Sequence, residues 1–146
     1  MTEQTVPATT GIDNIGIVEK FLYALRDEDF DTVGALLDDD VVYQNVGFST
    51  LRGGQRVTTL LSKMEGRVGF DVKIHRSAAD GATVLNERSD VIVFGPVRVN
   101  IWACGVFEVH DGRITLWRDR FDMVDFVLSF LRGAALRVLD RVRTTR

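Results

Sequence analysis

Apolar residues recur along this chain at two spacings, and the change from one to the other separates a helical part from a strand part. Over residues 13–26 they recur every three or four positions, which predicts an amphipathic helix. Asp29 is a typical N-cap residue and predicts a short second helix that ends at Asp38-Asp39-Asp40, interpreted as a solvated corner. Two more helices are expected, over residues 54–65 and from Asp122 onward, the latter interrupted at Gly133.

Alternation of apolar and polar residues, the period of a β-strand, dominates the second half of the chain. Asp80-Gly81, Gly95-Pro96 and Asp111-Gly112 punctuate it and predict tight turns, so consecutive strands should pair antiparallel. Gly105 lies inside one long run and predicts a bend or bulge. The expected strands are residues 41–46, 70–77, 83–94, 97–109 and 113–121, with a loop over residues 47–54.

Helices followed by a run of antiparallel strands are typical of an α+β fold. We expect a strongly curved, mixed but mostly antiparallel sheet that forms a cone, with the N-terminal helices over its concave face. The expected organisation is a flexible N-terminal tail over residues 1–12 and a single domain over residues 13–146.

Composition narrows the function classes without naming one. The chain has 146 residues, of which 45% are apolar and 27% charged, and its net charge is −3. Basic residues are interspersed with acidic ones, so no nucleic-acid partner is expected. Cys104 is the only cysteine, which excludes an intrachain disulfide and fits a reducing compartment. No secretory signal or membrane-spanning run is visible, and a cytoplasmic protein is expected.

Polar residues on otherwise apolar strand faces are the candidates for chemistry. Residues two apart on a strand share a face, so Arg88 projects together with Asp90, and Tyr43 with Asn45. Asp119 lies between two large aromatic residues on its own strand face, where an unpaired charge is costly. If the sheet curls, Asp119 faces Arg88 diagonally, and one guanidinium bridges two carboxylates. Spacing alone favours a structural ion pair over a proton-handling site, because structural networks also perturb pKa values.

Other chemistries find less support. His75 and His110 are far apart and neither is at a metal-ligand spacing, so no metal site is expected. The sequence has no phosphate-binding glycine loop and no nucleophile elbow. Ser89 lies on the face opposite Arg88 and has no evident base, and Cys104 is interpreted as a buried small hydrophobe.

Four short motifs carry a resemblance to a known family. They are Tyr43-Gln44-Asn45, Glu87-Arg88-Ser89-Asp90, Gly105-Val106-Phe107 and Ile114-Thr115-Leu116-Trp117-Arg118-Asp119. In this order and spacing they resemble the limonene-1,2-epoxide hydrolase family, within the nuclear-transport-factor-2-like (SnoaL-like) fold group, and its mycobacterial members most closely. Arg120 departs from the family pattern, which has an aromatic residue there. It lies on the face opposite Asp119 and is expected to alter packing or a dimer surface rather than chemistry.

The resemblance implies a cone-shaped α+β enzyme, usually dimeric, that opens an epoxide to a vicinal diol by direct attack of water. It implies that Tyr43, Asn45 and Asp119 hold the lytic water, that Asp90 is the acid, and that Arg88 bridges the two aspartates. An apolar pocket suggests a small hydrophobic epoxide of terpene, steroid or fatty-acyl type as the substrate, and detoxification of lipid epoxides is the expected role. No cofactor is implied. With the resemblance taken into account, a catalytic role for these residues is favoured over a structural ion pair.

Two other functions remain open on the same fold. A ketosteroid-isomerase-like enzyme needs a single carboxylate base and neutral hydrogen-bond donors, which Arg88 between two aspartates fits poorly. A non-catalytic module that binds small hydrophobic molecules would keep an apolar pocket but would need no matched carboxylates.

Overall fold

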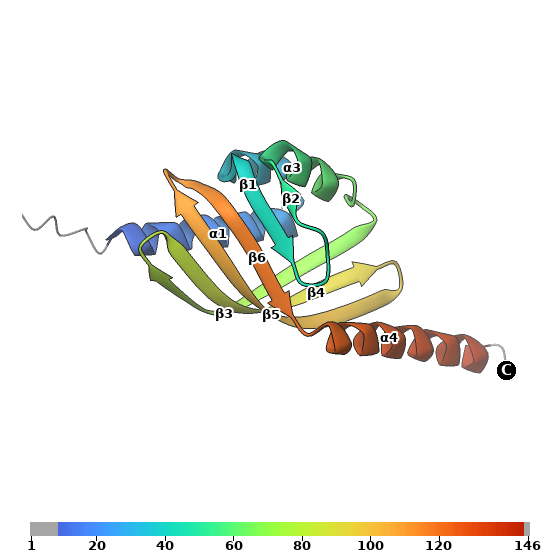
Figure 1. Cartoon of the computed structure of the whole chain (residues 1–146). Helices are drawn as coiled ribbons and strands as arrows, with labels where there is room; N and C mark the ends of the chain where they lie inside the picture. Colours follow the sequence, from blue (N-terminus) through green and yellow to red (C-terminus); the bar gives the residue numbers. More distant parts are fainter. Residues whose placement is uncertain (1–8, 145–146) are drawn as a thin grey trace, which may run out of the picture.

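The computed structural model describes residues 9–144, which form helices and strands in the order that Figure 1 shows. The helices are α1 (Thr9–Arg26), α2 (Phe30–Leu36), α3 (Gly54–Ser62) and α4 (Met123–Thr144). The strands are β1 (Leu37–Asn45), β2 (Leu51–Arg52), β3 (Val68–Asp80), β4 (Thr83–Phe94), β5 (Val97–His110) and β6 (Arg113–Phe121).

All of these strands belong to one curled sheet in the order β2-β1-β6-β5-β4-β3. Neighbouring strands pair antiparallel, except β1 and β6, which run parallel. Gly81, Gly95 and Gly112 adopt positive φ at the three hairpin turns, a conformation that glycine reaches at no steric cost. The expected mixed, mostly antiparallel sheet of an α+β fold is confirmed, and β6 lies beside β5, separated from β4 by one strand.

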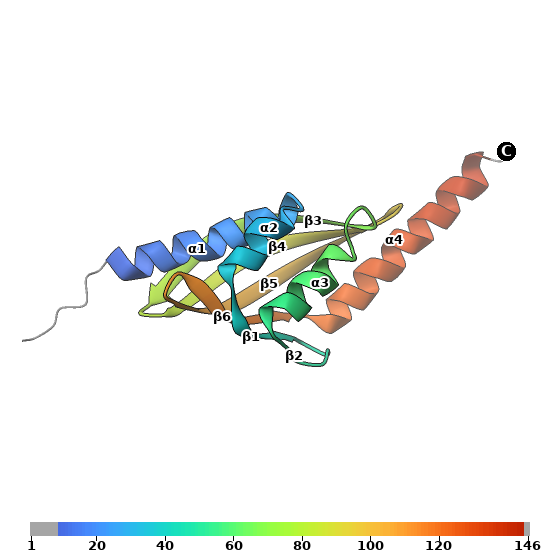
Figure 2. The same cartoon turned by 90° about the horizontal axis from the view of Figure 1, so that it is seen from above.

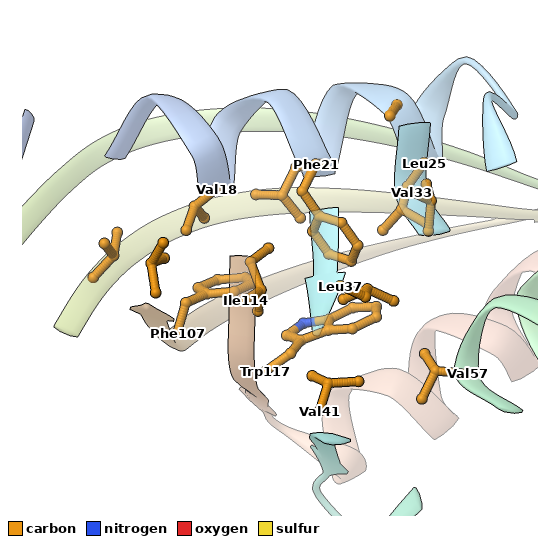
Figure 3. Packing of buried hydrophobic residues seen from close by; sticks show 14 of the residues in the cluster. Val18, Phe21, Leu25, Val33, Leu37, Val41, Val57, Phe107, Ile114 and Trp117 are labelled. Carbon is orange, nitrogen blue, oxygen red and sulfur yellow. The ribbon is translucent and has the colours of Figure 1, made fainter. Parts of the chain in front are cut away.

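Helix α1 lies across the inner face of the curled sheet (Figures 1 and 2), and the hydrophobic core lies between them. Buried and exposed residues alternate along β5, which places one apolar face inward. The Phe21 ring of α1 packs edge-on against Trp117 of β6, with ring centroids 4.9 Å apart, as Figure 3 shows. Phe107 of β5 stacks parallel to the same indole. These contacts fix α1 over the strands that carry the candidate residues.

Helix α4 extends away from the body of the molecule (Figures 1 and 2) and is continuous through Gly133. The expected interruption is therefore wrong. A single glycine costs a helix only about 1 kcal/mol, and here its missing side chain allows close packing, since a Cβ would lie 3.1 Å from Val97 Cγ1. Of the helices in the described residues, none is long and apolar enough to cross a membrane.

Several boundaries differ from the expected ones for local reasons. Helix α1 begins at Thr9, and residues 1–8 of the expected tail lie outside the described residues. Asp38-Asp39-Asp40 belongs to β1 rather than to a corner, because Leu37 and Val41 on either side of the run are buried in the core. The expected loop over residues 47–54 contains the short strand β2, and α3 ends at Ser62.

Two further expectations concern single residues of β5. Cys104 is exposed on the outer face of the sheet, not buried, because it alternates with the buried Ala103. Gly105 forms no bulge, since the register of β5 with β4 runs through it without a shift. Because it has no side chain, Gly105 instead leaves room above the inner face for the side chains of Arg88 and Asn86.

Candidate active site

A cavity of about 290 Å³ lies between the helices and the inner face of the sheet. Its apolar lining comes from α1, α2, α3, the strands, the intervening loops and the first turn of α4, and consists of Leu25, Phe30, Phe48, Leu61, Met64, Val68, Phe70, Ile92, Phe94, Ile101, Trp117, Phe121 and Phe126. Tyr43, Asn45, Arg88, Asp90 and Asp119 line the same cavity. The structure thus brings together every polar residue that the sequence analysis selected.

The guanidinium of Arg88 bridges the two aspartates. Its Nε lies 2.9 Å from Asp90 Oδ1 and 3.1 Å from Asp90 Oδ2, on the same strand. Its Nη2 lies 2.7 Å from Asp119 Oδ1, two strands away. Arg88 is only 1% exposed, so both contacts lie in a low-dielectric environment, where a charge must be paired.

Gly105 makes the span from β4 to β6 possible. It is the β5 residue that pairs with Asp119 on one side and with Asn86 on the other. A Cβ at this position would overlap Arg88 Nη1 and would lie 2.7 Å from Asn86 Oδ1, so only glycine leaves room for the guanidinium. The arginine therefore crosses β5 through the space above Gly105.

Tyr43 and Asn45 lie beside Asp119 because β1 runs parallel to β6 with Asn45 in register with Asp119. Asn45 Nδ2 donates to the Tyr43 hydroxyl over 2.8 Å, and the Tyr43 ring packs on Trp117. Asn45 Oδ1 and Asp119 Oδ1 are buried acceptors that receive no aligned hydrogen bond within the described residues, although Arg88 Nη2 is close to the latter. Both acceptors can take a hydrogen bond from a small donor such as water.

Burial and charge shift the pKa values of these groups in different directions. Burial raises the pKa of Asp90 to about 6, against the opposing pull of Arg88 and with a smaller contribution from Asp119. Burial, followed by the charge of Asp119, raises the pKa of Tyr43 above its ordinary value. Burial alone would lower the pKa of Arg88, but the charges of Asp119 and Asp90 outweigh it and raise that pKa. Near neutral pH the site therefore holds a protonated phenol, a charged guanidinium and a carboxyl able to carry a proton.

Sequence reasoning missed Asn86, which lies on β4 two residues before Arg88. Its side chain is 4% exposed, and its Oδ1 accepts a hydrogen bond from Arg88 Nη1 over 3.0 Å. The same strand alternation that paired Arg88 with Asp90 places Asn86 on this face too. That alternation was the available signal.

The expectation that Ser89 has no base nearby is wrong. His75 Nε2 lies 2.7 Å from Ser89 Oγ, because β3 and β4 pair side by side. This pair does not line the cavity. Arg120 is exposed and in register with Cys104 on the outer face, opposite Asp119 as expected. Within residues 9–144, no group of three or more His, Cys, Asp or Glu residues could hold a metal ion.

Comparisons with known proteins show what this chain is similar to. A model of the limonene-1,2-epoxide hydrolase catalytic domain matches residues 12–132. The epoxide hydrolase EphG of Mycobacterium tuberculosis is 61% identical over 128 residues, which cover 88% of this chain and 86% of that protein. A solved structure of an M. tuberculosis LEH-like epoxide hydrolase is 60% identical with a TM-score of 0.85, over 89% of this chain and 98% of the other.

More distant neighbours share the fold alone. An NTF2-like protein of unknown function from Cytophaga hutchinsonii is 22% identical with a TM-score of 0.63, over 75% of this chain and 89% of the other. Together these likenesses define a small α+β protein of the NTF2-like class. Within that class, the chain belongs to the limonene-1,2-epoxide hydrolase family, as its motifs indicated, and it is an epoxide hydrolase.

Proposed function

We propose that this enzyme opens a small hydrophobic epoxide to a vicinal diol in one step, with Asp119 as the base and Asp90 as the acid. The observation that carries the proposal is the position of both carboxylates on one buried guanidinium, that of Arg88, at an apolar cavity. An epoxide is a poor electrophile at neutral pH, because its ring oxygen would leave as an alkoxide. Protonation of that oxygen by Asp90 removes this obstacle while water attacks the carbon from the opposite side.

Tyr43, Asn45 and Asp119 are proposed to hold the attacking water. Asn45 Oδ1 and Asp119 Oδ1 can each accept one of its two protons in a hydrogen bond. The Tyr43 hydroxyl accepts from Asn45 Nδ2, so its own proton is available to the water oxygen. Water held in this way needs little further ordering to attack, which lowers the entropic part of the barrier.

The proton balance closes without any other reactant. One proton passes from water to Asp119 as the new carbon–oxygen bond forms, and the proton of Asp90 passes to the ring oxygen as the ring bond breaks. The diol leaves with Asp90 ionised and Asp119 protonated, and proton exchange with solvent restores the starting state. Arg88 stays charged throughout and stabilises whichever carboxylate is ionised.

The other functions considered on this fold find less support at the site. A ketosteroid-isomerase-like reaction does not use a cationic bridge between two carboxylates. A binding module has no need for Arg88 to be held between two buried acids, each of which costs desolvation. The epoxide reaction uses both acids and the bridge.

The mainly apolar lining favours a neutral hydrophobic substrate, and we include terpene, steroid and fatty-acyl epoxides in the proposed class. Removal of reactive lipid epoxides is the corresponding cellular role. The test is diol formation from one epoxide of each type, followed by mass spectrometry, with wild-type enzyme and the Asp90→Asn variant in parallel. If the wild type produced no diol from any of these epoxides, the proposed substrate class would be excluded.

We further propose that the enzyme is a homodimer. One side of α4 packs on the body through Phe130, which contacts Phe94. The opposite side carries exposed apolar residues at the 3–4 spacing of a helix–helix seam: Val124, Leu128, Leu131 and Val138. An exposed apolar stripe of this kind indicates a contact surface. Light scattering should give twice the chain mass for the wild type, and Leu131→Glu should lower it toward a single chain.

A cytoplasmic location is proposed from the exposed free thiol of Cys104. Exposed thiols persist in compartments kept reducing and tend to oxidise outside them. Fractionation of the source cells, with detection of the protein by antibody, tests this location. Recovery of the protein mainly outside the cytoplasmic fraction would contradict it.

A further inference from the structure

Asn86 is the third partner of the Arg88 guanidinium, and no part of the chemistry above accounts for it. We propose that Asn86 is a positioning residue, a neutral acceptor that fixes the guanidinium between the two aspartates without adding a third charge. This inference rests on the proposed roles of Asp90 and Asp119. Asn86 does not line the cavity, so it acts on the reaction only through Arg88.

The three contacts of the guanidinium use its three nitrogens. Nε contacts Asp90, Nη2 contacts Asp119, and Nη1 donates to Asn86 Oδ1 over 3.0 Å. With contacts at Nε and Nη2 alone, the guanidinium plane can still tilt, because the arginine stem is flexible. The third contact removes this freedom, and the absence of a Cβ at Gly105 lets the amide and Nη1 lie together above the sheet.

The orientation of the amide follows from its chemistry. Arginine offers only donors, so the carbonyl oxygen of Asn86 must face Nη1. The Nδ2 group is then left buried, and it has no hydrogen-bond partner among the described residues. Such an orphan donor is unfavourable for folding. A leucine of similar size would avoid that cost, so the amide is best explained by the acceptor that it supplies to Arg88.

The neutrality of Asn86 matters because the cluster already holds one cation and two acids. With Asp90 protonated and Asp119 ionised, the charges of the cluster sum to zero. An aspartate at position 86 would give Arg88 a third carboxylate and would make it harder for Asp90 to ionise. The amide therefore satisfies the guanidinium while leaving Asp90 free to lose its proton near the working pH.

Other titratable groups around this cluster are few. Tyr43 of β1 faces the two aspartates and remains protonated. From α1, Glu19 accepts a hydrogen bond from Ser77, the β3 residue in register with Asn86. Glu28 and Glu65 also line the cavity, but both are exposed to solvent, where salt screens their charge.

Two variants of Asn86 separate positioning from charge. Asn86→Leu removes the acceptor, and kcat should fall about tenfold to a hundredfold, because small displacements of catalytic groups are costly, while KM changes little. Asn86→Asp keeps the shape and adds a charge, and it should raise the titration midpoint of the Asp90 carboxyl by about one pH unit. Carbon-13 NMR of aspartate-labelled enzyme measures that midpoint directly, with the Asp90 signal assigned by its loss in Asp90→Asn.

Asn14 supplies the matched control. It is also a buried asparagine, 7% exposed against 4% for Asn86, but its Nδ2 donates to Gly81 O in the β3–β4 turn. Asn14→Asp should lower the melting temperature and leave the Asp90 midpoint and the pH profile of kcat unchanged. The Asn86 variants should change kcat or its pH profile, whereas Asn14→Asp should change neither even if it lowers the melting temperature as much.

The outcomes distinguish this inference from the proposed function. A folded Asn86→Leu enzyme with wild-type kcat would overturn the positioning role, and so would an Asn86→Asp enzyme with an unmoved Asp90 midpoint. If Asn86→Asp does not fold, the kcat of Asn86→Leu decides alone. If instead Asp90→Asn retains activity while Asn86→Asp still moves the Asp90 midpoint, the catalytic assignment fails and the link from Asn86 through Arg88 stands.

Discussion

Gly105 lies directly beneath the guanidinium of Arg88, and this contact determines whether an arginine on β4 can reach an aspartate on β6. Each neighbouring β5 position of the same face carries a side chain, Ala103 on one side and Phe107 on the other. The site therefore depends on a residue that takes no part in the chemistry and touches no substrate. Its substitution tests the geometry with the smallest possible change.

Gly105→Ala should reduce kcat by roughly a hundredfold, because the new methyl group displaces the guanidinium from one or both aspartates. Overpacking should also lower the free energy of unfolding by about 1–3 kcal/mol. Steady-state kinetics and urea unfolding measure the two effects. Gly16→Ala is the control, because nothing lies within 4 Å of the added atom in α1. Normal kinetics in Gly105→Ala would mean that the bridge is not needed.

Asp90→Asn and Asp119→Asn should each lose activity by a hundredfold or more while the protein stays folded. Asparagine keeps the shape of the carboxylate but can neither give the proton that the leaving oxygen needs nor accept one from water. Diol formation and circular dichroism provide the two measurements. Asp39→Asn serves as the control, since that carboxylate is almost fully exposed. Near-normal turnover in either folded site variant rules out the assigned role.

Arg88→Lys should also be severely impaired. The planar fork of arginine reaches two aspartates and Asn86 at once, whereas an ammonium group is a compact charge that cannot span the same distance. Arg118→Lys, on the outer face where Arg118 binds Gln44, is the control. Wild-type rates together with an unchanged pH profile in Arg88→Lys would reduce Arg88 to a simple counter-charge.

The raised pKa of Asp90 predicts how both activity and stability depend on pH. The acid must be protonated, so kcat/KM should fall as the pH rises through about 6. In the folded protein this carboxyl binds its proton more tightly than in the unfolded chain, where its pKa is near 3.8. The free energy of unfolding therefore falls as the pH rises from about 4 to about 6, by an amount on the order of 3 kcal/mol.

The stability part is measured by thermal unfolding of the wild type and Asp90→Asn across that pH range. Asparagine does not titrate, so the wild type should lose stability relative to the variant as the pH rises. Parallel curves for the two proteins would show that Asp90 titrates at the same pH in the folded and unfolded states. A kcat/KM profile flat from pH 5 to pH 8 would argue against Asp90 as the acid.

Strand alternation was sufficient to select the polar strand residues that line the cavity. Because the period of a strand is two, Arg88 had to share a face with Asp90, and Asp119 needed a partner for its charge. The three Asp-Gly or Gly-Pro turns gave the strand order that brings β6 beside β5. The α+β class and the curled sheet followed from these local signals, so both were predictable from the sequence.

What could not be predicted depends on contacts between distant segments. Strand alternation places Asn86 on the same face as Arg88, but the contact of Asn86 with Arg88 Nη1 depends on the rotamer that the arginine adopts over Gly105. The pair of His75 and Ser89 depends on a register shift between β3 and β4 that no turn residue signals. Likewise, α4 continues through Gly133 because a strand end packs against that glycine.

Direct attack by water predicts where labelled oxygen goes during a single turnover. With enzyme in excess in ¹⁸O-labelled water, the one-step reaction places the label in the first diol and none in the protein. The other common route to a diol first forms an ester with an aspartate and then hydrolyses it. That route delivers unlabelled oxygen from the enzyme to the first diol and leaves label on the aspartate.

The site geometry favours the one-step result. Asp90 and Asp119 are both held by Arg88, which lowers the freedom and the nucleophilicity of either carboxylate. Asn45 Oδ1 and Asp119 Oδ1 together offer acceptors for a water molecule, an arrangement that an attacking carboxylate would not need. Peptide mass spectrometry of the protein after one turnover measures the label directly. Label in a peptide that contains Asp90 or Asp119 would overturn the one-step mechanism even if the diol were formed at the expected rate.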